Sequence, residues 1–248
     1  MKLSIIIPIF NEEKTILETL KKVISVKIPN VDKEIIIVND GSTDGTASVI
    51  SNIPAKQDLA SRDKFSISNI KIINHKENQG KGAAVRTGIN NSSGDYILIQ
   101  DADLEYDPKD IPLLLEPILQ KKAIVVYGTR LKRLPNLRKD ERTPQFLLHY
   151  MGNKFLSLLT SILYGQWITD METCYKLFPR KAVEKINLVA KGFEFEPEIT
   201  SKLLKRGYKI VEVPIKTEPR GYKEGKKLHT IRDGFMTLYS LLKYRLVD

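Results

Sequence analysis

Four short runs rich in isoleucine and valine constrain the fold most, because most of their residues are apolar. The runs cover residues 3–7, 34–38, 70–73 and 96–99, and segments with helical patterns separate them. Strands of this kind are buried on both faces, which is typical of parallel sheets covered by helices. The sequence therefore predicts an α/β fold with a mostly parallel sheet flanked by helices.

The remaining elements continue the same alternation. The first helix is expected to have Asn11 as its N-cap, with Glu12 and Glu13 in its first turn. Its apolar face is formed by Ile16, Leu20 and Val23. A second helix is expected from Thr46, after a turn. Further strands are expected at residues 124–127 and 209–213, and further helices at residues 144–163, 195–205 and 230–246.

Length and composition favour one domain in a reducing compartment. The chain has 248 residues, and no linker rich in glycine, serine or proline divides it. The single cysteine, Cys174, excludes an internal disulfide and, with three histidines, leaves no zinc constellation. No run reaches the roughly 18 apolar residues of a spanning helix. We therefore expect a cytoplasmic protein that contacts a membrane only peripherally, on its cytoplasmic face.

The net charge of +10 predicts an anionic partner, either nucleic acid, an acidic membrane surface or a phosphorylated substrate. Basic residues gather in two groups, at residues 132–142 and 220–232. They do not alternate with aromatic residues, and no nucleic-acid-binding signature is present, so nucleic acid is disfavoured. The first group lies in residues 131–143, which we expect to form a surface loop that closes over a substrate.

Three carboxylates follow the run at residues 96–99, namely Asp101, Asp103 and Glu105. Residues two apart in a strand share a face, so Asp101 and Asp103 can point at one ligand. Oxygen ligands of this kind suit Mg²⁺ or Mn²⁺, and Mg²⁺ is usually shared with substrate phosphates. A metal site and a phosphate ester substrate are therefore expected. The alternative is a strand-end loop that is acidic only because it is solvated.

Two more loops are candidates for ligand binding, because ligands bind at the strand ends of such sheets. Asp40, in the turn at residues 39–45, is a candidate contact to a base or ribose, unless Asp40 and Asp44 only shape the turn. Lys81 lies between two glycines before a helix and can meet a diphosphate there. Equally, the glycines can simply let the chain turn. The loop matches neither a Walker A motif nor a dinucleotide fingerprint.

The second half holds a further acidic pair and two apolar helices. Asp170 and Glu172 can act as a general base or orient an acceptor, or can form a structural pair. The helix at residues 144–163 carries Lys154 as its only full charge. It is expected either in the core or partly in a lipid interface, and the amphipathic helix at 230–246 either docks on a membrane or packs on its own domain.

Four of these motifs, in this order, resemble the nucleotide-sugar half of family 2 glycosyltransferases with the GT-A fold. The motifs lie at residues 4–12, 38–45, 78–82 and 101–103. The resemblance implies a single GT-A domain with a nucleotide-sugar half at 1–130 and an acceptor half at 131–248. It also implies that a base pocket is lined by Pro8, Phe10 and Glu12, that Asp40 contacts the nucleoside, and that Asp101 and Asp103 hold the metal and the donor diphosphate.

Residues 169–176 and 220–227 resemble one branch of that family, the dolichyl- and polyprenyl-phosphate hexose synthases. The resemblance implies that the donor and acceptor phosphates are bound by Arg130, Arg142 and Arg220. Many members of the branch carry C-terminal transmembrane helices, which this sequence lacks. Attachment to lipid is thus expected to depend on the apolar helices and basic charge, or on a separate membrane-protein partner.

The expected reaction is the inverting, metal-dependent transfer of a hexose to dolichyl or polyprenyl phosphate, with mannose from GDP-mannose favoured. A lipid monophosphate is already anionic at neutral pH, so it needs positioning by arginines and not deprotonation. Asp103, Arg130 and Arg220, together with Asp170 or Glu172, are the expected catalytic residues. The alternatives are UDP-glucose as donor, a hydroxyl acceptor with Asp170 or Glu172 as base, and a non-catalytic nucleotide-binding module.

Overall fold

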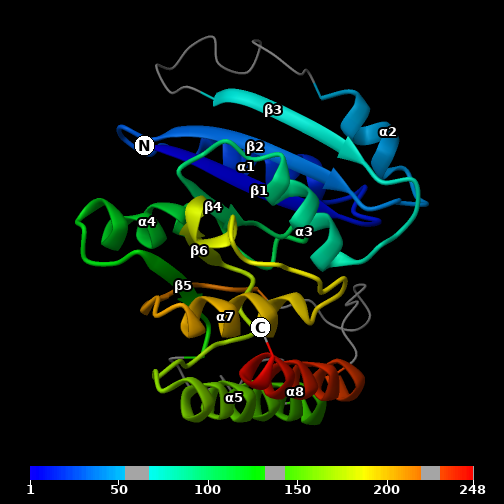
Figure 1. Cartoon of the computed structure of the whole chain (residues 1–248). Helices are drawn as coiled ribbons and strands as arrows, with labels where there is room; N and C mark the ends of the chain where they lie inside the picture. Colours follow the sequence, from blue (N-terminus) through cyan, green and yellow to red (C-terminus); the bar gives the residue numbers. More distant parts are fainter. Residues whose placement is uncertain (54–66, 132–142, 219–229, 248) are drawn as a thin grey trace.

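The computed structural model is centred on a seven-stranded sheet, and it describes residues 1–53, 67–131, 143–218 and 230–247. The strand order is β3-β2-β1-β4-β6-β5-β7, as Figure 1 shows. β6 runs antiparallel to both of its neighbours, and the other pairs are parallel. The strands are β1 (Lys2–Ile9), β2 (Asp32–Asn39), β3 (Ile67–Asn74), β4 (Tyr96–Ile99), β5 (Val125–Thr129), β6 (Lys176–Pro179) and β7 (Ile210–Pro214).

Helices cover both faces of the sheet, and alternate residues of β1 point to opposite sides. Leu3, Ile5 and Ile7 pack into one core with α1 and α4, whereas Ile6 packs into a second core with α3 and α7. The helices are α1 (Ile16–Ser25), α2 (Thr46–Ser51), α3 (Lys81–Asn90), α4 (Ile111–Leu119), α5 (Pro144–Tyr164), α6 (Arg180–Val183), α7 (Phe195–Lys205) and α8 (Thr230–Leu246), with a short 3-10 helix at Pro108–Asp110.

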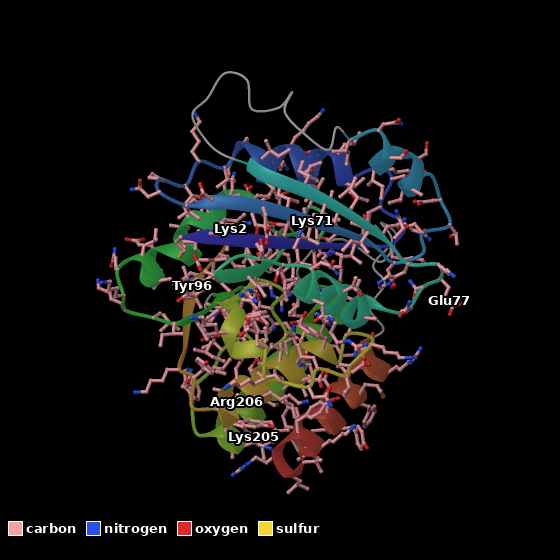
Figure 2. All side chains as sticks on the ribbon, turned by 45° about the horizontal axis from the view of Figure 1, so that its top comes forward. Lys2, Lys71, Glu77, Tyr96, Lys205 and Arg206 are labelled. Carbon is pink, nitrogen blue, oxygen red and sulfur yellow. The ribbon has the colours of Figure 1, made fainter. Side chains whose placement is uncertain are left out.

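The starts and the ends of the parallel strands lie at opposite sides of the molecule. Figure 2 shows Lys2 and Tyr96, which begin β1 and β4, far from Glu77, which follows the end of β3. The loops after β1, β2, β3 and β4 therefore meet on the Glu77 side. Loops at this edge are where open α/β sheets bind ligands.

The expected α/β class with a mostly parallel sheet is confirmed, and each of the expected strands is present. β6 was not expected, because it has only four residues, begins with a lysine and ends with a proline. The expected N-cap was wrong. The helix begins at Ile16 with Thr15 as N-cap, so Glu12 and Glu13 precede it. Asn11 instead adopts a positive φ of 53°, which asparagine tolerates better than most residues.

The helix expected at residues 144–163 is present as α5, with Thr143 as its N-cap. It forms an outer layer with α8, and Figure 1 shows the two helices side by side at the end of the molecule opposite β3. The hydroxyl of Tyr164 donates to the carbonyl of Leu241, which ties the two helices together. The loop expected at 131–143 lies, except for its two end residues, outside the described residues, as does most of the second basic group.

The buried carboxylate of Glu34, on β2, connects this strand to the start of β1 and to the turn at residues 93–94. It accepts hydrogen bonds from Ser93 Oγ at 2.6 Å and from the amide of Gly94 at 3.1 Å, and it pairs with Lys2 Nζ at 2.9 Å. Ser4 Oγ also donates to it. Burial raises the pKa of Glu34, but these hydrogen bonds outweigh it and lower the pKa to about 2. The carboxylate thus fixes the 93–94 turn against β1 and β2.

We predict that Glu34→Gln lowers the free energy of unfolding at pH 7 by about 2 to 3 kcal/mol, because hydrogen bonds to a charged group are lost. A carboxyl with a lowered native pKa stabilises the fold above its unfolded pKa and loses this contribution as the pH falls towards 2. Urea unfolding at pH 7 and pH 3 measures both effects. The difference between wild type and variant should shrink at pH 3, and an unchanged difference would contradict the assignment.

Candidate active site

The loops after β1 and β2 are held together by backbone donors. The amide of Asn11 donates to Ser42 Oγ at 3.0 Å, and the amide of Glu12 donates to Thr46 Oγ1 at 2.9 Å. Glu12 is buried, and its carboxylate accepts a hydrogen bond from the hydroxyl of Thr15 at 2.7 Å. The loop after β1 also carries the half-buried Phe10, beside the half-buried Pro8. The three residues expected to line a base pocket therefore lie on one stretch of chain, and their role stays a prediction.

Asp40, expected to contact a nucleoside, is 2% exposed at the end of β2. Its Oδ1 accepts a hydrogen bond from the amide of Gln79 at 3.0 Å and lies 2.7 Å from His75 Nδ1. Its Oδ2 accepts from the amide of Gly80 at 2.7 Å. The carboxylate thus holds the loop before α3 in place. A nucleoside contact of Asp40 stays a prediction. In this structure its carboxylate binds the backbone amides of the loop.

Lys81 lies at the start of α3, between two glycines whose hydrogen atoms face another loop. A Cβ at Gly80 would lie 2.4 Å from the carbonyl oxygen of Lys191, and Gly80 has a φ of +97°. This close approach requires glycine there. Lys81 Nζ lies 2.8 Å from Asp101 Oδ1 and 2.9 Å from Cys174 Sγ. The expected diphosphate-binding lysine therefore reaches the acidic loop after β4.

The three carboxylates after β4 lie close enough to repel one another. Burial raises the pKa of Asp103 to about 7, and the charges of Asp101 and Glu105 add to the shift. Burial also raises the pKa of Asp101, but Lys81 outweighs it and the net pKa is lowered. Leu104 has a φ of 66°, which turns the chain between them. Lys81 thus contacts Asp101 directly and has only a weaker effect on Asp103.

The chemistry of Asp101, Asp103 and Glu105 fits a hard divalent cation. Their carboxylates repel one another and supply the oxygen ligands that such a cation prefers. Across the residues with described positions, however, no three His, Cys, Asp or Glu side chains are already arranged to hold a metal ion. Asp103 Oδ1 accepts a hydrogen bond from the amide of Glu105 at 3.0 Å. The expected metal role of Asp101, Asp103 and Glu105 therefore stays a prediction.

Arg130 follows β5 directly and forms an ion pair with Asp170. Arg130 Nε and Nη2 donate to the two carboxylate oxygens of Asp170, each at 2.8 Å, and the Arg130 amide donates at 2.8 Å as well. Asp170 is 0% exposed. The arginine side chain also lies over the ring of Tyr106, with 5.9 Å to the centroid. Bidentate pairing fixes the guanidinium plane, so Asp170 orients Arg130 in this structure.

Glu212, on β7, accepts hydrogen bonds from the turn that carries Asp170. The amides of Thr169 and Asp170 each donate to its carboxylate at 2.9 Å, and so does Thr169 Oγ1. The hydroxyls of Thr129 and Thr169 lie 2.8 Å apart. The turn that carries Asp170 is therefore fixed to β5 and β7 before any ligand binds.

Glu172 belongs to a second buried group of charges with Lys176 and Glu196. Lys176 Nζ lies 2.5 Å from Glu196 Oε2 and donates to the carbonyl of Met171 at 2.9 Å. Burial raises the pKa of Glu172 to about 7, although Lys176 acts against this shift. Glu172 Oε1 is buried and has no hydrogen-bond partner within the described ranges.

Two expected phosphate-binding residues, Arg142 and Arg220, lie outside the described residues. The chain before Arg220 is nevertheless placed. The amide of Glu218 donates to the carbonyl of Glu105 at 3.0 Å, and Thr217 forms an antiparallel bridge with Tyr106. The last described residues before Arg220 therefore run along the acidic loop.

Sequence reasoning missed Glu196, Lys176 and Glu212. Glu196 lies in α7, 3.7 Å from Lys81 Nζ, and so links the site to the second half of the chain. The run of three glutamates at residues 194, 196 and 198 next to Pro197 was an available signal. Lys176 ends the motif at residues 169–176 but was given no role, and nothing in the sequence marked Glu212. Each acquires its role only when β6 and β7 join the sheet.

Comparison with known proteins shows related chains. The model of the family described as "Glycosyl transferase family 2" matches residues 4–187. A UDP-N-acetylglucosamine–dolichyl-phosphate N-acetylglucosaminyltransferase from Methanococcus voltae is 30% identical, over 98% of this chain and 95% of its own. A dolichyl-phosphate beta-glucosyltransferase from Trichomonas vaginalis is 32% identical, over 85% of this chain and 62% of its own.

Solved structures share the fold. Glucosyl-3-phosphoglycerate synthase from Mycobacterium tuberculosis, in complex with Mn²⁺, UDP and phosphoglyceric acid, matches 100% of this chain and 79% of its own. The TM-score is 0.69 at 18% sequence identity. The likeness confirms the expected architecture of the sheet and its flanking helices.

We predict that Asp170→Asn lowers the free energy of unfolding by about 3 to 5 kcal/mol, because it leaves Arg130 poorly paired in a largely buried position. Arg130→Gln alone should also destabilise, and the double variant should cost less than the sum of the two. Urea denaturation of the three variants provides the double-mutant cycle. Strict additivity would show that the two side chains are not coupled.

Proposed function

The chain belongs to glycosyl transferase family 2, and from that premise we propose that it transfers a sugar from a nucleoside diphosphate to dolichyl or another polyprenyl phosphate. The proposal depends most on one observation, which is that the acidic loop after β4 lies beside two cations, Lys81 and Arg130, that the fold holds in place. Lys81 contacts Asp101, and Arg130 is close enough to lower the pKa of Asp101 through its charge. Such a site can balance the charges of two phosphate-bearing substrates.

A phosphate acceptor fits Arg130 better than a neutral acceptor does. Asp170 fixes its guanidinium through Nε and Nη2, so the guanidinium is already oriented when an anion arrives. Arg142 and Arg220 would complete the phosphate contacts. An oxygen of the lipid phosphate attacks the anomeric carbon, and the bond from that carbon to the nucleoside diphosphate breaks with inversion. No covalent sugar–enzyme intermediate is needed.

A divalent cation, Mg²⁺ or Mn²⁺, would be held by Asp101 and Asp103, with Glu105 nearby. When bound, it would neutralise charge on the departing diphosphate. Asp103 supplies a carboxylate whose charge is made unfavourable without a cation, first by burial and then by repulsion from Asp101 and Glu105. Lys81 provides a second positive charge from the N-terminus of α3, where backbone amides also favour an anion. Pro8, Phe10, Glu12 and Asp40 are the proposed contacts of the base and ribose.

For the donor, we propose a UDP-sugar. The sequence favoured GDP-mannose, with UDP-glucose as the alternative, and no residue of the site distinguishes the two bases. The name of one relative, which includes UDP-N-acetylglucosamine, supports a UDP-sugar. The other relative is named as a beta-glucosyltransferase, which supports glucose over mannose. The acceptor named for both relatives is dolichyl phosphate, which supports the acceptor proposed above.

One observation favours a second candidate, transfer to a hydroxyl group. The pKa of Glu172 is raised to about 7, which suits a general base near neutral pH. Asp170 is a poorer base, because both of its oxygens already accept hydrogen bonds from Arg130. Comparing polyprenyl phosphate with the corresponding polyprenol as acceptor distinguishes the two functions.

We predict that a UDP-sugar raises the melting temperature more than GDP-mannose does, and that Mn²⁺ increases the shift. A ligand that binds only the native state stabilises it by about 2.7 kcal/mol at a hundredfold excess over its Kd. The panel consists of UDP-glucose, UDP-N-acetylglucosamine, GDP-mannose, UDP and GDP, each with and without Mn²⁺. A shift with GDP-mannose alone would overturn the donor assignment.

We predict that Asp103→Asn lowers turnover by about 10² to 10³ or more. The same change should leave the melting temperature of the metal-free protein unchanged or raise it, because it removes a buried charge that its neighbours repel. Radiolabelled sugar transfer to polyprenyl phosphate and differential scanning fluorimetry measure the two effects. Asp32→Asn, at an exposed position at the start of β2, is the control. Full activity of Asp103→Asn would refute the metal assignment.

A further inference from the structure

The outer face of α5 carries a continuous apolar stripe. Ile162 is 71% exposed and Phe155 is 59% exposed. The spacing alternates between three and four residues, so the side chains share one helix face. The stripe consists of Leu148, Met151, Phe155, Leu158 and Ile162.

The side of α5 that packs on the protein is more polar than that of an ordinary surface helix, although it includes the buried Leu156. The side that packs on the protein contains small polar residues, among them Asn153, Ser157, Thr160 and Ser161, which are buried. A helix of a water-soluble protein normally turns its apolar face to the core. The second core takes up Leu156, with Leu159 and Leu163 partly buried against it, but it does not account for the exposed stripe. Of the two expectations for this helix, a core position therefore holds for the inner side only.

α8 has a matching stripe beside it. Phe235, Tyr239, Leu242 and Leu246 are exposed at the same helical spacing, while Thr237, Ser240, Leu241 and Tyr244 are buried. α8 packs against α5, and the hydrogen bond from Tyr164 to Leu241 joins them. Figure 1 shows the pair as an outer layer beyond α7. The two stripes are called the outer face below.

Basic residues flank the apolar residues of α8. Arg232, Lys243 and Arg245 are exposed on the helix, and the chain as a whole carries a net charge of +10. Apolar residues flanked by cations match the two layers of an anionic bilayer surface, which are acyl chains and phosphate headgroups. None of the helices in the described ranges has the length and hydropathy to cross a membrane.

The helix α5 is also tied to the chain that leaves the proposed acceptor site. Lys154 of α5 donates from Nζ to the carbonyl of Leu131, the residue after Arg130. α5 therefore packs directly against the chain that leaves the candidate phosphate-binding arginine. A lipid acceptor whose tail lies in a bilayer beneath α5 would present its phosphate on this side.

We propose that the outer face docks on the surface of an anionic phospholipid bilayer, with α5 and α8 lying in the plane of the interface. This inference rests on the proposed function in one respect, since a lipid acceptor gives the docking its purpose. A second copy of the chain is a poorer occupant. Two outer faces that meet would bring Arg232, Lys243 and Arg245 of each copy towards the same basic residues.

Sedimentation with sucrose-loaded vesicles tests the proposal. Wild-type protein should sediment with vesicles of phosphatidylcholine and phosphatidylglycerol, less with phosphatidylcholine alone, and less at high salt. The double variant Phe155→Glu, Ile162→Glu should lower the partition coefficient by about tenfold or more. Leu119→Glu changes an equally apolar residue of α4 that is 47% exposed, and it should bind vesicles as wild type does.

A second variant, Arg232→Glu with Lys243→Glu and Arg245→Glu, should remove the dependence on phosphatidylglycerol. Circular dichroism and the melting temperature verify that each variant is folded. Equal vesicle binding by wild type and the α5 variant would overturn the proposal. So would a wild-type dimer in sedimentation equilibrium that the α5 variant abolishes, combined with no vesicle binding.

The failure of this inference and that of the proposed function are distinguishable with wild-type protein. Transfer to a short, water-soluble polyprenyl phosphate requires no bilayer, and vesicle binding requires no substrate. Transfer without vesicle binding would overturn the docking and leave the reaction. Vesicle binding without transfer to any polyprenyl phosphate would support the docking and count against the reaction.

Discussion

The ammonium of Lys81 joins the two halves of the chain electrostatically. It lies against Asp101, from the loop after β4, and 3.7 Å from Glu196, from α7. Cys174 is a third neighbour at 2.9 Å. Removing a buried cation from two carboxylates leaves them uncompensated, which is costly in a low dielectric. The site therefore exists only when residues far apart in sequence have folded against one another.

Much of the nucleotide-sugar half was predictable, because its features are local. The strands are apolar runs, and the carboxylates of Asp101 and Asp103 follow one of them directly. The tasks of individual side chains were less accessible. Asp40 is occupied by the loop before α3, and this follows from loop geometry that a sequence pattern does not express. Asn11 was misassigned for the same reason, since capping residues also serve in left-handed turns.

The acceptor half was harder to predict, because its structure depends on long-range pairing. Asp170 and Glu172 are alike in sequence, two residues apart, yet one is saturated by Arg130 while the other keeps an oxygen without a partner in the described residues. The difference arises from the groups that surround each side chain, which are Arg130 for Asp170 and the pair of Lys176 and Glu196 for Glu172. The helix α5 shows the same limit. Its composition left burial and lipid contact both open, and only the packing shows which face is outside.

The position of β7 at the edge of the sheet, next to β5, limits where the chain can be cut. The match to the family model ends at residue 187, whereas β5 is sandwiched between β6 and β7, and β7 begins at Ile210. A fragment cut at 187 would lose β7 and α7, and with them Ile199 and Leu203 of the second core. It would leave β5 as a bare apolar edge, which invites edge-to-edge aggregation. The end of the match to the family model is therefore not a boundary of the folding unit.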